Sequence, residues 1–166
     1  MDTFFEQLVT IKKDFKTYLL IVAICLFAIL ICAVLLFLLG NMALLPIFGV
    51  GYGAYKLFSL LNIEYEYIIT NGILDVDIIY NKSSRKRLLS LDLRTVTRLE
   101  KYSPSFTVNI NKKLLTTACN NNDENALFLV AEAEGKSNSY LVFSPDERLR
   151  SAMQKYVPKF TQSVLK

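Results

Sequence analysis

Histidine and tryptophan are both missing from the 166 residues of the chain, and cysteine occurs only three times. Without histidine, the chain has no Ser-His-Asp or Cys-His catalytic group and no histidine-ligated metal site. Cys25 and Cys32 lie inside one long apolar stretch, and only Cys119 lies outside it. This distribution excludes a disulfide framework and a four-cysteine zinc site, and we expect no cofactor.

A strong excess of charge is also missing, because the net charge is only +4 at pH 7. Nucleic-acid-binding domains are usually far more basic and carry lysine and arginine in clusters, so we expect no nucleic acid partner. Apolar residues make up 52% of the chain and are concentrated between Tyr18 and Leu61. The apolar excess therefore belongs to one segment and not to the whole fold.

Two apolar stretches, residues 18–39 and 42–61, are separated only by Gly40-Asn41. As a helix, the first stretch would be roughly 33 Å long, enough to cross a hydrocarbon core of about 30 Å. It is also longer than the apolar core of a cleaved signal peptide. Lys56 is the only charge in the second stretch and lies near its end, where its ammonium group can reach the interface. The sequence therefore predicts a transmembrane helical hairpin.

Positive charges flank the outer ends of this hairpin. Lys12, Lys13 and Lys16 precede the first stretch, the Gly40-Asn41 turn has no charge, and a basic run follows the second stretch. Because lysine and arginine favour the cytoplasmic side, we expect both termini in the cytoplasm of a cell whose inner membrane the hairpin crosses.

Residues 1–16 have the pattern of a short amphipathic helix. Thr3 and Glu6 have the spacing of a capping box, and apolar residues recur at helical spacing after them. This helix would either extend the first membrane span or lie on the lipid headgroups.

From residue 62 onward the pattern becomes that of a β-rich domain. Residues 64–70 and 73–80 alternate in polarity around Asn71-Gly72, which is the strongest short signal for a β-hairpin. Ser144-Pro145 then begins an amphipathic C-terminal helix that Pro158 ends. We expect further strands at residues 86–91, 95–102, 114–119, 126–134 and 139–143. The expected organisation is an N-terminal segment at 1–16, a hairpin at 17–61, a cytoplasmic domain at 62–160 and a loose tail at 161–166.

The stretches EYEYIITNGILDVD and RKRLLSLDLRTVTRLE resemble the bacterial membrane-anchored pleckstrin-homology-like (PH-like) domains, and so does the closing YLVFSPDERLRSAMQKYVP. The opening MDTFFEQLV and the spacing of the two apolar stretches resemble a two-span bacterial membrane-protein family of unknown function. The resemblance implies an all-β fold of about seven strands with a C-terminal capping helix. It implies no catalytic residues, because its motifs are structural.

The strongest charge cluster is the run from Lys82 to Arg87, which also contains Arg85 and Lys86. We expect this run to form the loop between two strands, within reach of anionic lipid. Each lysine or arginine near such a surface contributes about 1 kcal/mol of attraction. A specific headgroup pocket and cross-strand pairing with Asp75 and Asp77 are the alternatives.

Three further features have a simple structural explanation and a functional alternative. Gly49 and Gly53 form a small-xxx-small pair that would pack either against the first span or against a second copy of the chain. Cys119 is expected to be a small buried residue at a strand end. The alternative, a nucleophile, would need a base, and the chain has no histidine. Asp75 and Asp77 could form an acid pair but are expected to make exposed salt bridges.

These observations favour a non-enzymatic scaffold or adaptor that binds a protein partner, or a second copy of itself, at the inner membrane face. An accessory subunit of a membrane transporter or membrane enzyme is the alternative, in which the hairpin is the working part. A module that binds anionic lipid is a further possibility.

Overall fold

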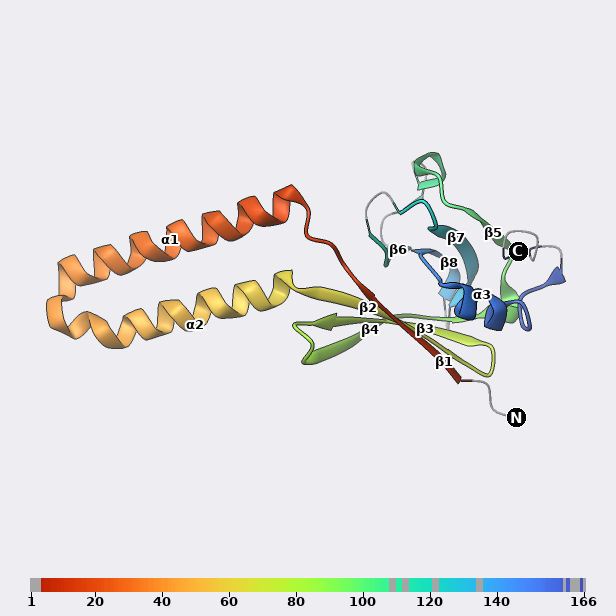
Figure 1. Ribbon diagram of the computed structural model, residues 1–166, viewed down its shortest axis with the longest axis horizontal. Helices are drawn as coiled ribbons and strands as arrows, with labels where there is room; N and C mark the ends of the chain where they lie inside the picture. Colours follow the sequence, from red (N-terminus) through yellow and green to blue (C-terminus); the bar gives the residue numbers. More distant parts are fainter. Residues whose placement is uncertain are drawn as a thin grey trace.

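The computed structural model of the chain describes residues 4–107, 110–111, 114–120, 123–133, 136–159, 161 and 165. It contains a helical hairpin at one end and a β-rich domain at the other (Figure 1). The strands are β1 (Phe4–Thr10), β2 (Ile63–Thr70), β3 (Ile73–Tyr80), β4 (Ser84–Asp92), β5 (Arg98–Lys101), β6 (Leu115–Thr117), β7 (Leu127–Ala133) and β8 (Lys136–Phe143). The α-helices are α1 (Phe15–Leu39), α2 (Leu44–Leu61) and α3 (Glu147–Met153), with short 3-10 turns η1 (Gly40–Ala43), η2 (Leu93–Thr95) and η3 (Pro104–Thr107).

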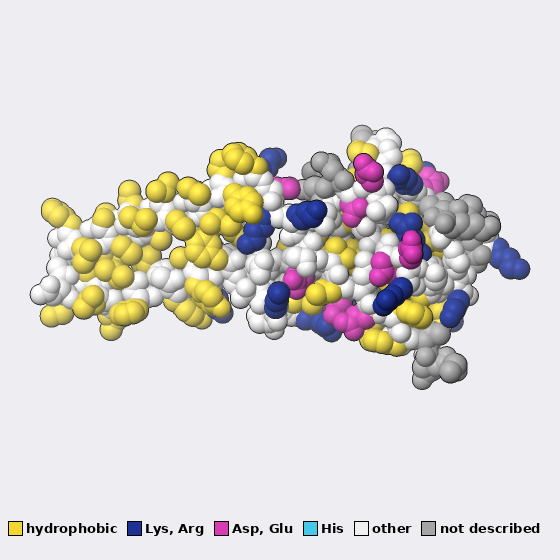
Figure 2. All heavy atoms as spheres, viewed as in Figure 1, with side chains coloured by type: hydrophobic (Ala, Val, Ile, Leu, Met, Phe, Trp, Pro, Cys, Tyr) yellow, Lys and Arg dark blue, Asp and Glu magenta, His cyan; other side chains and the backbone are white. Residues whose placement is uncertain are grey.

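The apolar segment is helical throughout Phe15–Leu61 and is long and apolar enough to cross a membrane, judged by its length and composition. Within it, η1 reverses the chain so that α1 and α2 lie side by side (Figure 1). Gly40 takes a positive φ of 51° at the end of α1, a conformation that glycine adopts without a steric cost. Neither α1 nor α2 has a buried residue, and apolar side chains are spread over the face of the hairpin that Figure 2 shows.

The predicted helix over residues 1–16 is wrong, because Phe4–Thr10 form the edge strand β1 and only residues from Phe15 onward are helical. β1 pairs antiparallel with β2 along its whole length, from Phe4 opposite Thr70 to Thr10 opposite Glu64. Thr3, the first residue of the expected capping box, lies outside the described residues. The domain therefore does not begin at residue 62, since its first strand precedes the hairpin.

The β-hairpin predicted around Asn71-Gly72 is confirmed. Both residues have positive φ angles, 51° and 91°, as a two-residue turn of this kind requires. Seven strands, β2 to β8, follow the apolar segment in the described part of the chain, as expected, and β1 is an eighth. The order in the sheet is β1-β2-β3-β4-β7-β8-β6, and β5 pairs with β7.

The main core lies between the β1–β4 part of the sheet, β7 and β8, and the C-terminal helix α3. Tyr67, Leu74 and Leu91 are fully buried in it, together with Phe143. Tyr67 packs its ring edge-on against Phe143 at 5.6 Å, and its hydroxyl donates a hydrogen bond to the carbonyl oxygen of Ala118. The tyrosine thus connects β2 to the segment after β6.

Helix α3 covers the core as predicted, with Leu149, Ala152 and Met153 buried. It begins at Glu147, later than the predicted start at Ser144-Pro145, and its N-cap is Asp146, whose carboxylate accepts a 2.7 Å hydrogen bond from the Leu149 amide. The tail is not loose where it is described, because Leu165 is only 4% exposed and belongs to the core. The other tail residues except Thr161 lie outside the described residues.

Candidate functional site

The outer face of the sheet, which points away from the core, carries four acidic side chains on two neighbouring strands. Glu64 and Glu66 alternate on β2, and Asp75 and Asp77 alternate on β3, so all four share one face. Glu66 lies directly opposite Asp77 in the register. Carboxylates in directly opposed positions repel each other, so this face requires cations to balance it.

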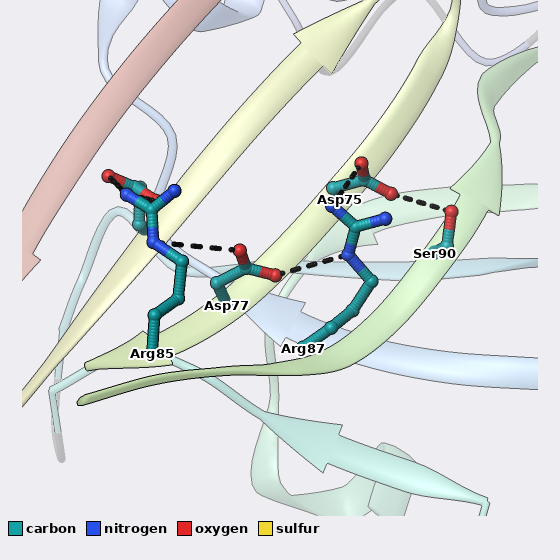
Figure 3. Close-up of polar contacts among 6 residues, drawn as sticks. Asp75, Asp77, Arg85, Arg87 and Ser90 are labelled. Carbon is teal, nitrogen blue, oxygen red and sulfur yellow. Dashed lines mark hydrogen bonds and ion pairs between the residues drawn. The ribbon is translucent and has the colours of Figure 1, made fainter. Parts of the chain in front are cut away.

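Arg85 and Arg87 of β4 supply these cations (Figure 3). Arg85 pairs with Glu66, and its Nε lies 3.9 Å from Oδ2 of Asp77. Arg87 joins both aspartates, with its Nη2 2.9 Å from Oδ2 of Asp75 and its Nε 3.3 Å from Oδ1 of Asp77. We call these five residues the ion-pair cluster. The cross-strand pairing considered from the sequence is therefore present in the structure.

A β-bulge brings the arginines into place. Val76 pairs with Leu89 whereas Asp77 pairs with Arg87, so β4 has Leu88 as an extra residue. The extra residue shifts the register and sets Arg87 opposite Asp77. Ser90, on the other side of the bulge, donates a 2.6 Å hydrogen bond to Oδ1 of Asp75.

The carboxylates of the ion-pair cluster are much more buried than its guanidinium groups. The side chains of Glu66 and Asp77 are 3% and 4% exposed, whereas those of Arg85 and Arg87 are 52% and 57% exposed. Burial raises the pKa of Glu66 above its ordinary value, a hydrogen bond with Glu6 raises it further, and Arg85 acts in the opposite direction. Glu66 Oε2 lies close to Arg85 but without hydrogen-bond geometry, so this atom has no hydrogen-bond partner in the described structure.

The basic run does not form the loop that the sequence predicts. The turn is only Asn81–Ser83, and β4 begins at Ser84, so Arg85, Lys86 and Arg87 are strand residues. Lys82 lies in the turn with a positive φ of 55°. Lys82 and Lys86 are exposed and make no ion pair within the described residues, whereas the two arginines belong to the ion-pair cluster.

This turn lies beside the end of α2. The amide of Asn81 donates a 2.7 Å hydrogen bond to the carbonyl oxygen of Asn62, the residue that follows α2. The Asn62 side chain also donates to Oδ1 of Asn81 at 3.4 Å. Lys82 is therefore held next to the end of the apolar hairpin.

The connection from β1 to α1 is also fixed. Asn120 accepts a 2.7 Å hydrogen bond from the amide of Lys12, and its side chain donates to the carbonyl oxygen of Thr10 at 3.3 Å. These bonds tie the segment between β1 and α1 to the loop after β6. The domain is thus attached to the hairpin at both α1 and α2.

Cys119 is buried as predicted, although β6 ends two residues earlier at Thr117. Burial, with a smaller contribution from Asp123, raises the pKa of its thiol to about 11. The thiol is therefore protonated at neutral pH and is a poor nucleophile. In the described part of the chain, no group of three or more histidine, cysteine, aspartate or glutamate residues could hold a metal ion.

The glycines of α2 make no close contact in the structure. A Cβ atom built on Gly49, Gly51 or Gly53 would meet no described heavy atom within 4 Å. The structure therefore does not pack Gly49 and Gly53 closely against α1, which was one of the two expected partners.

Among protein families, the one described as "Bacterial PH-like domain (DUF6106)" matches the chain over residues 1–162. The match includes β1 and the apolar hairpin as well as the β-rich domain. No curated protein and no solved structure matches the chain significantly.

Proposed function

The chain belongs to the bacterial PH-like domain family, and from this premise we propose that it is a non-enzymatic, membrane-anchored docking module. In this proposal α1 and α2 each cross the inner membrane, and both termini lie in the cytoplasm. The lysines at positions 12, 13 and 16 lie at the start of the hairpin and Lys56 lies near its end, and they support this orientation because lysine is enriched on the cytoplasmic side.

The observation that carries the proposal is the double attachment of the sheet to the hairpin. Strand β1 leads into α1, and α2 leads directly into β2, which pairs with β1. Two adjacent strands thus continue into two adjacent helices, and the Asn120 hydrogen bonds hold one of the connections. Such an attachment keeps one face of the domain at a constant orientation to the bilayer, which suits a docking surface.

The docking surface proposed here is the part of the outer face on β1. Phe4 and Leu8 are 60% and 52% exposed on this strand, although both are large and apolar. Exposed aromatic and aliphatic side chains next to charged groups are typical of the anchors of protein interfaces. The partner is either another membrane-associated protein or a second copy of the chain.

The experiment is purification of the full chain from native membranes in mild detergent. We expect a stoichiometric protein partner or a defined homo-oligomer, and we expect Phe4→Asn with Leu8→Asn to abolish the association. Lys101→Asn with Glu132→Asn changes two exposed residues elsewhere and serves as the control. A chain that purifies alone as a monomer would contradict the proposal.

A second candidate is an accessory subunit whose hairpin binds another transmembrane helix. The open space around the α2 glycines favours it, since small residues allow helix backbones to approach closely in lipid. Gly49 and Gly53 lie on one helical face, and Gly51 points to the opposite side. Gly49→Ile with Gly53→Ile should therefore abolish helix association measured in membranes, whereas Gly51→Ile should leave it unchanged. Equal effects of the two changes would contradict a helix-docking face.

Contact with anionic lipid remains a subsidiary proposal, now limited to Lys82 and Lys86. Their exposure and the position of the Asn81–Ser83 turn beside the end of α2 support it. The attraction is diffuse, so it should follow membrane charge and weaken as salt shortens the screening length. Binding that distinguishes headgroups of equal charge through these lysines would contradict it.

A further inference from the structure

A hollow of about 830 Å³ lies where the start of α1 meets the domain. The first turn of α1 forms one wall, and the segments after β5 and around β6 and β7 form the others. A smaller hollow of about 280 Å³ adjoins it and shares Asp14, Thr117 and Cys119 with it. We call the larger one the juxtamembrane hollow, since the apolar hairpin begins at its wall.

The charges around the juxtamembrane hollow are mostly negative. Asp14, Asp123 and Glu124 line it, and Lys16 is the only cation among the described lining residues. Glu124 is exposed, and Oδ1 of Asp123 accepts a 2.9 Å hydrogen bond from the Asn125 amide. Carboxylates around a concave site favour a ligand that carries an ammonium group.

The most buried residues that line the hollow are uncharged. Ala126 is 1% exposed and Cys119 is 9% exposed. The Cys119 thiol has no hydrogen-bond partner within the described residues, and its raised pKa keeps it protonated. Ala126 and Cys119 belong to the apolar cluster around Phe128, so the hollow ends against this cluster.

The position of the hollow indicates where the ligand comes from. Phe15, which lines it, is 80% exposed and begins the apolar hairpin. A molecule in the hollow can thus extend an apolar part along α1 into the bilayer. Lys16 also lines the hollow and supplies a positive charge that can meet a phosphate group.

We propose that the juxtamembrane hollow binds the headgroup of a phospholipid that ends in a primary ammonium group. The ammonium group donates hydrogen bonds to Asp123 and Glu124, Lys16 contacts the phosphate, and the acyl chains lie beside α1. This site differs from the lysines of the β3–β4 turn, which attract anionic lipid without recognising it. The inference rests on the proposed insertion of the hairpin into the membrane and does not depend on a protein partner.

The test is native mass spectrometry of the full chain, released from mixed micelles with equal amounts of phosphatidylethanolamine, phosphatidylcholine and phosphatidylglycerol. We expect selective retention of the ethanolamine lipid. Asp123→Asn with Glu124→Gln should lower the ratio of retained ethanolamine to choline lipid by at least about tenfold, because both hydrogen bonds lose their charged acceptor. Asparagine at 123 keeps an acceptor for the Asn125 amide. The matched control is Glu132→Gln with Glu147→Gln, two exposed acids outside the hollow.

A second measurement uses Cys119 as a reporter in a chain with Cys25→Ala and Cys32→Ala. A neutral aromatic disulfide reagent should modify Cys119 more slowly in nanodiscs that contain phosphatidylethanolamine than in nanodiscs of phosphatidylcholine or phosphatidylglycerol. The proposal would be overturned if Cys119 reacted at the same rate in the three lipids. It would also be overturned if the chain retained phosphatidylcholine as well as phosphatidylethanolamine, or preferred phosphatidylglycerol. Resistance of the chain to carbonate extraction is measured in parallel, so that failed insertion is told apart from a missing lipid site.

Discussion

Glu66 is a buried carboxyl group on the outer face of the sheet, and its pKa is raised. Its side chain is only 3% exposed, Glu6 and Asp77 are near it, and Arg85 is its cationic partner. Burial and the neighbouring acids favour the protonated form, so the folded state binds a proton more tightly than the unfolded state does. This difference connects a single carboxyl group to the pH dependence of folding.

We expect Glu66 to lower the free energy of unfolding as the pH rises from the ordinary glutamate value of 4.5 through its raised pKa in the folded state. Below both pKa values the group is protonated in both states and has no such effect. Denaturant titrations over this pH range should therefore show a free energy of unfolding that falls as the pH rises, and Glu66→Gln should make this fall smaller. Glu132→Gln changes an exposed residue and serves as the control, and it should leave this pH dependence unchanged. Identical pH profiles for the wild-type chain and Glu66→Gln would contradict the assignment.

Arg85 and Lys86 are adjacent cations that we expect to behave differently. Arg85→Ala leaves the buried carboxylates of Glu66 and Asp77 without one of their cations, and should cost about 1–3 kcal/mol in the free energy of unfolding. Lys86→Ala removes an exposed side chain, and should change it by less than about 0.5 kcal/mol. In liposome binding, Lys82→Ala with Lys86→Ala should have the larger effect. Equal losses of stability would show that the ion-pair cluster contributes nothing to the fold.

At the scale of elements, the sequence predicts a helix, strand or turn correctly where that element is determined by residues close together in the chain. Asn71-Gly72 predicts its turn because the backbone there needs positive φ angles. The apolar stripe of α3 is likewise predicted by its own spacing. The long apolar segment is helical throughout, as its composition predicts.

Strand β1 could not be predicted in this way, because its pattern fits two structures. Apolar residues at positions 4, 5, 8 and 9 recur at helical spacing, yet Phe5 and Val9 also alternate with exposed neighbours. The partner that decides between them, β2, begins more than 50 residues later in the chain. The juxtamembrane hollow was missed for the same reason, since it combines side chains from Asp14 to Ala126.

The strand assignment makes a prediction about two neighbouring phenylalanines. Phe5 packs against the core, whereas Phe4 is 60% exposed on the other face of β1. We expect Phe5→Ala to lower the free energy of unfolding by about 2 kcal/mol and Phe4→Ala to change it by less than about 0.5 kcal/mol. Chemical denaturation of the two variants in detergent measures both. Equal effects would favour a helix on the headgroups over a strand.

At the scale of the whole molecule, the β-rich domain is interrupted by the apolar helical hairpin. Thr10 at the end of β1 lies opposite Glu64 near the start of β2, so the hairpin leaves and re-enters the sheet at nearly one place. The boundary expected at residue 62 therefore cuts one strand from the sheet. Removing the hairpin should preserve the fold only if β1 is retained.

This geometry predicts that a short turn can replace the hairpin. Residues 4–10 joined by Asn-Gly to residues 64–165, which keeps Thr10 opposite Glu64, should give a soluble, β-rich protein with cooperative unfolding. A fragment of residues 62–165 keeps Leu165 but lacks β1 and exposes the edge of β2, so we expect it to aggregate or unfold at lower denaturant. Circular dichroism and size-exclusion chromatography compare the two. A fragment without β1 that is as stable as the joined protein would show that β1 is dispensable.

The most direct test of a membrane-crossing hairpin with a cytoplasmic domain is labelling of single cysteines in intact cells with a membrane-impermeant maleimide. With the three native cysteines replaced by alanine, Asn41→Cys lies in the turn between α1 and α2, and Glu147→Cys lies exposed on the domain. The proposed topology predicts that the cysteine at 41 reacts in intact cells, and that the one at 147 reacts only after the membrane is disrupted. Labelling at 147 but not at 41 in intact cells would contradict it.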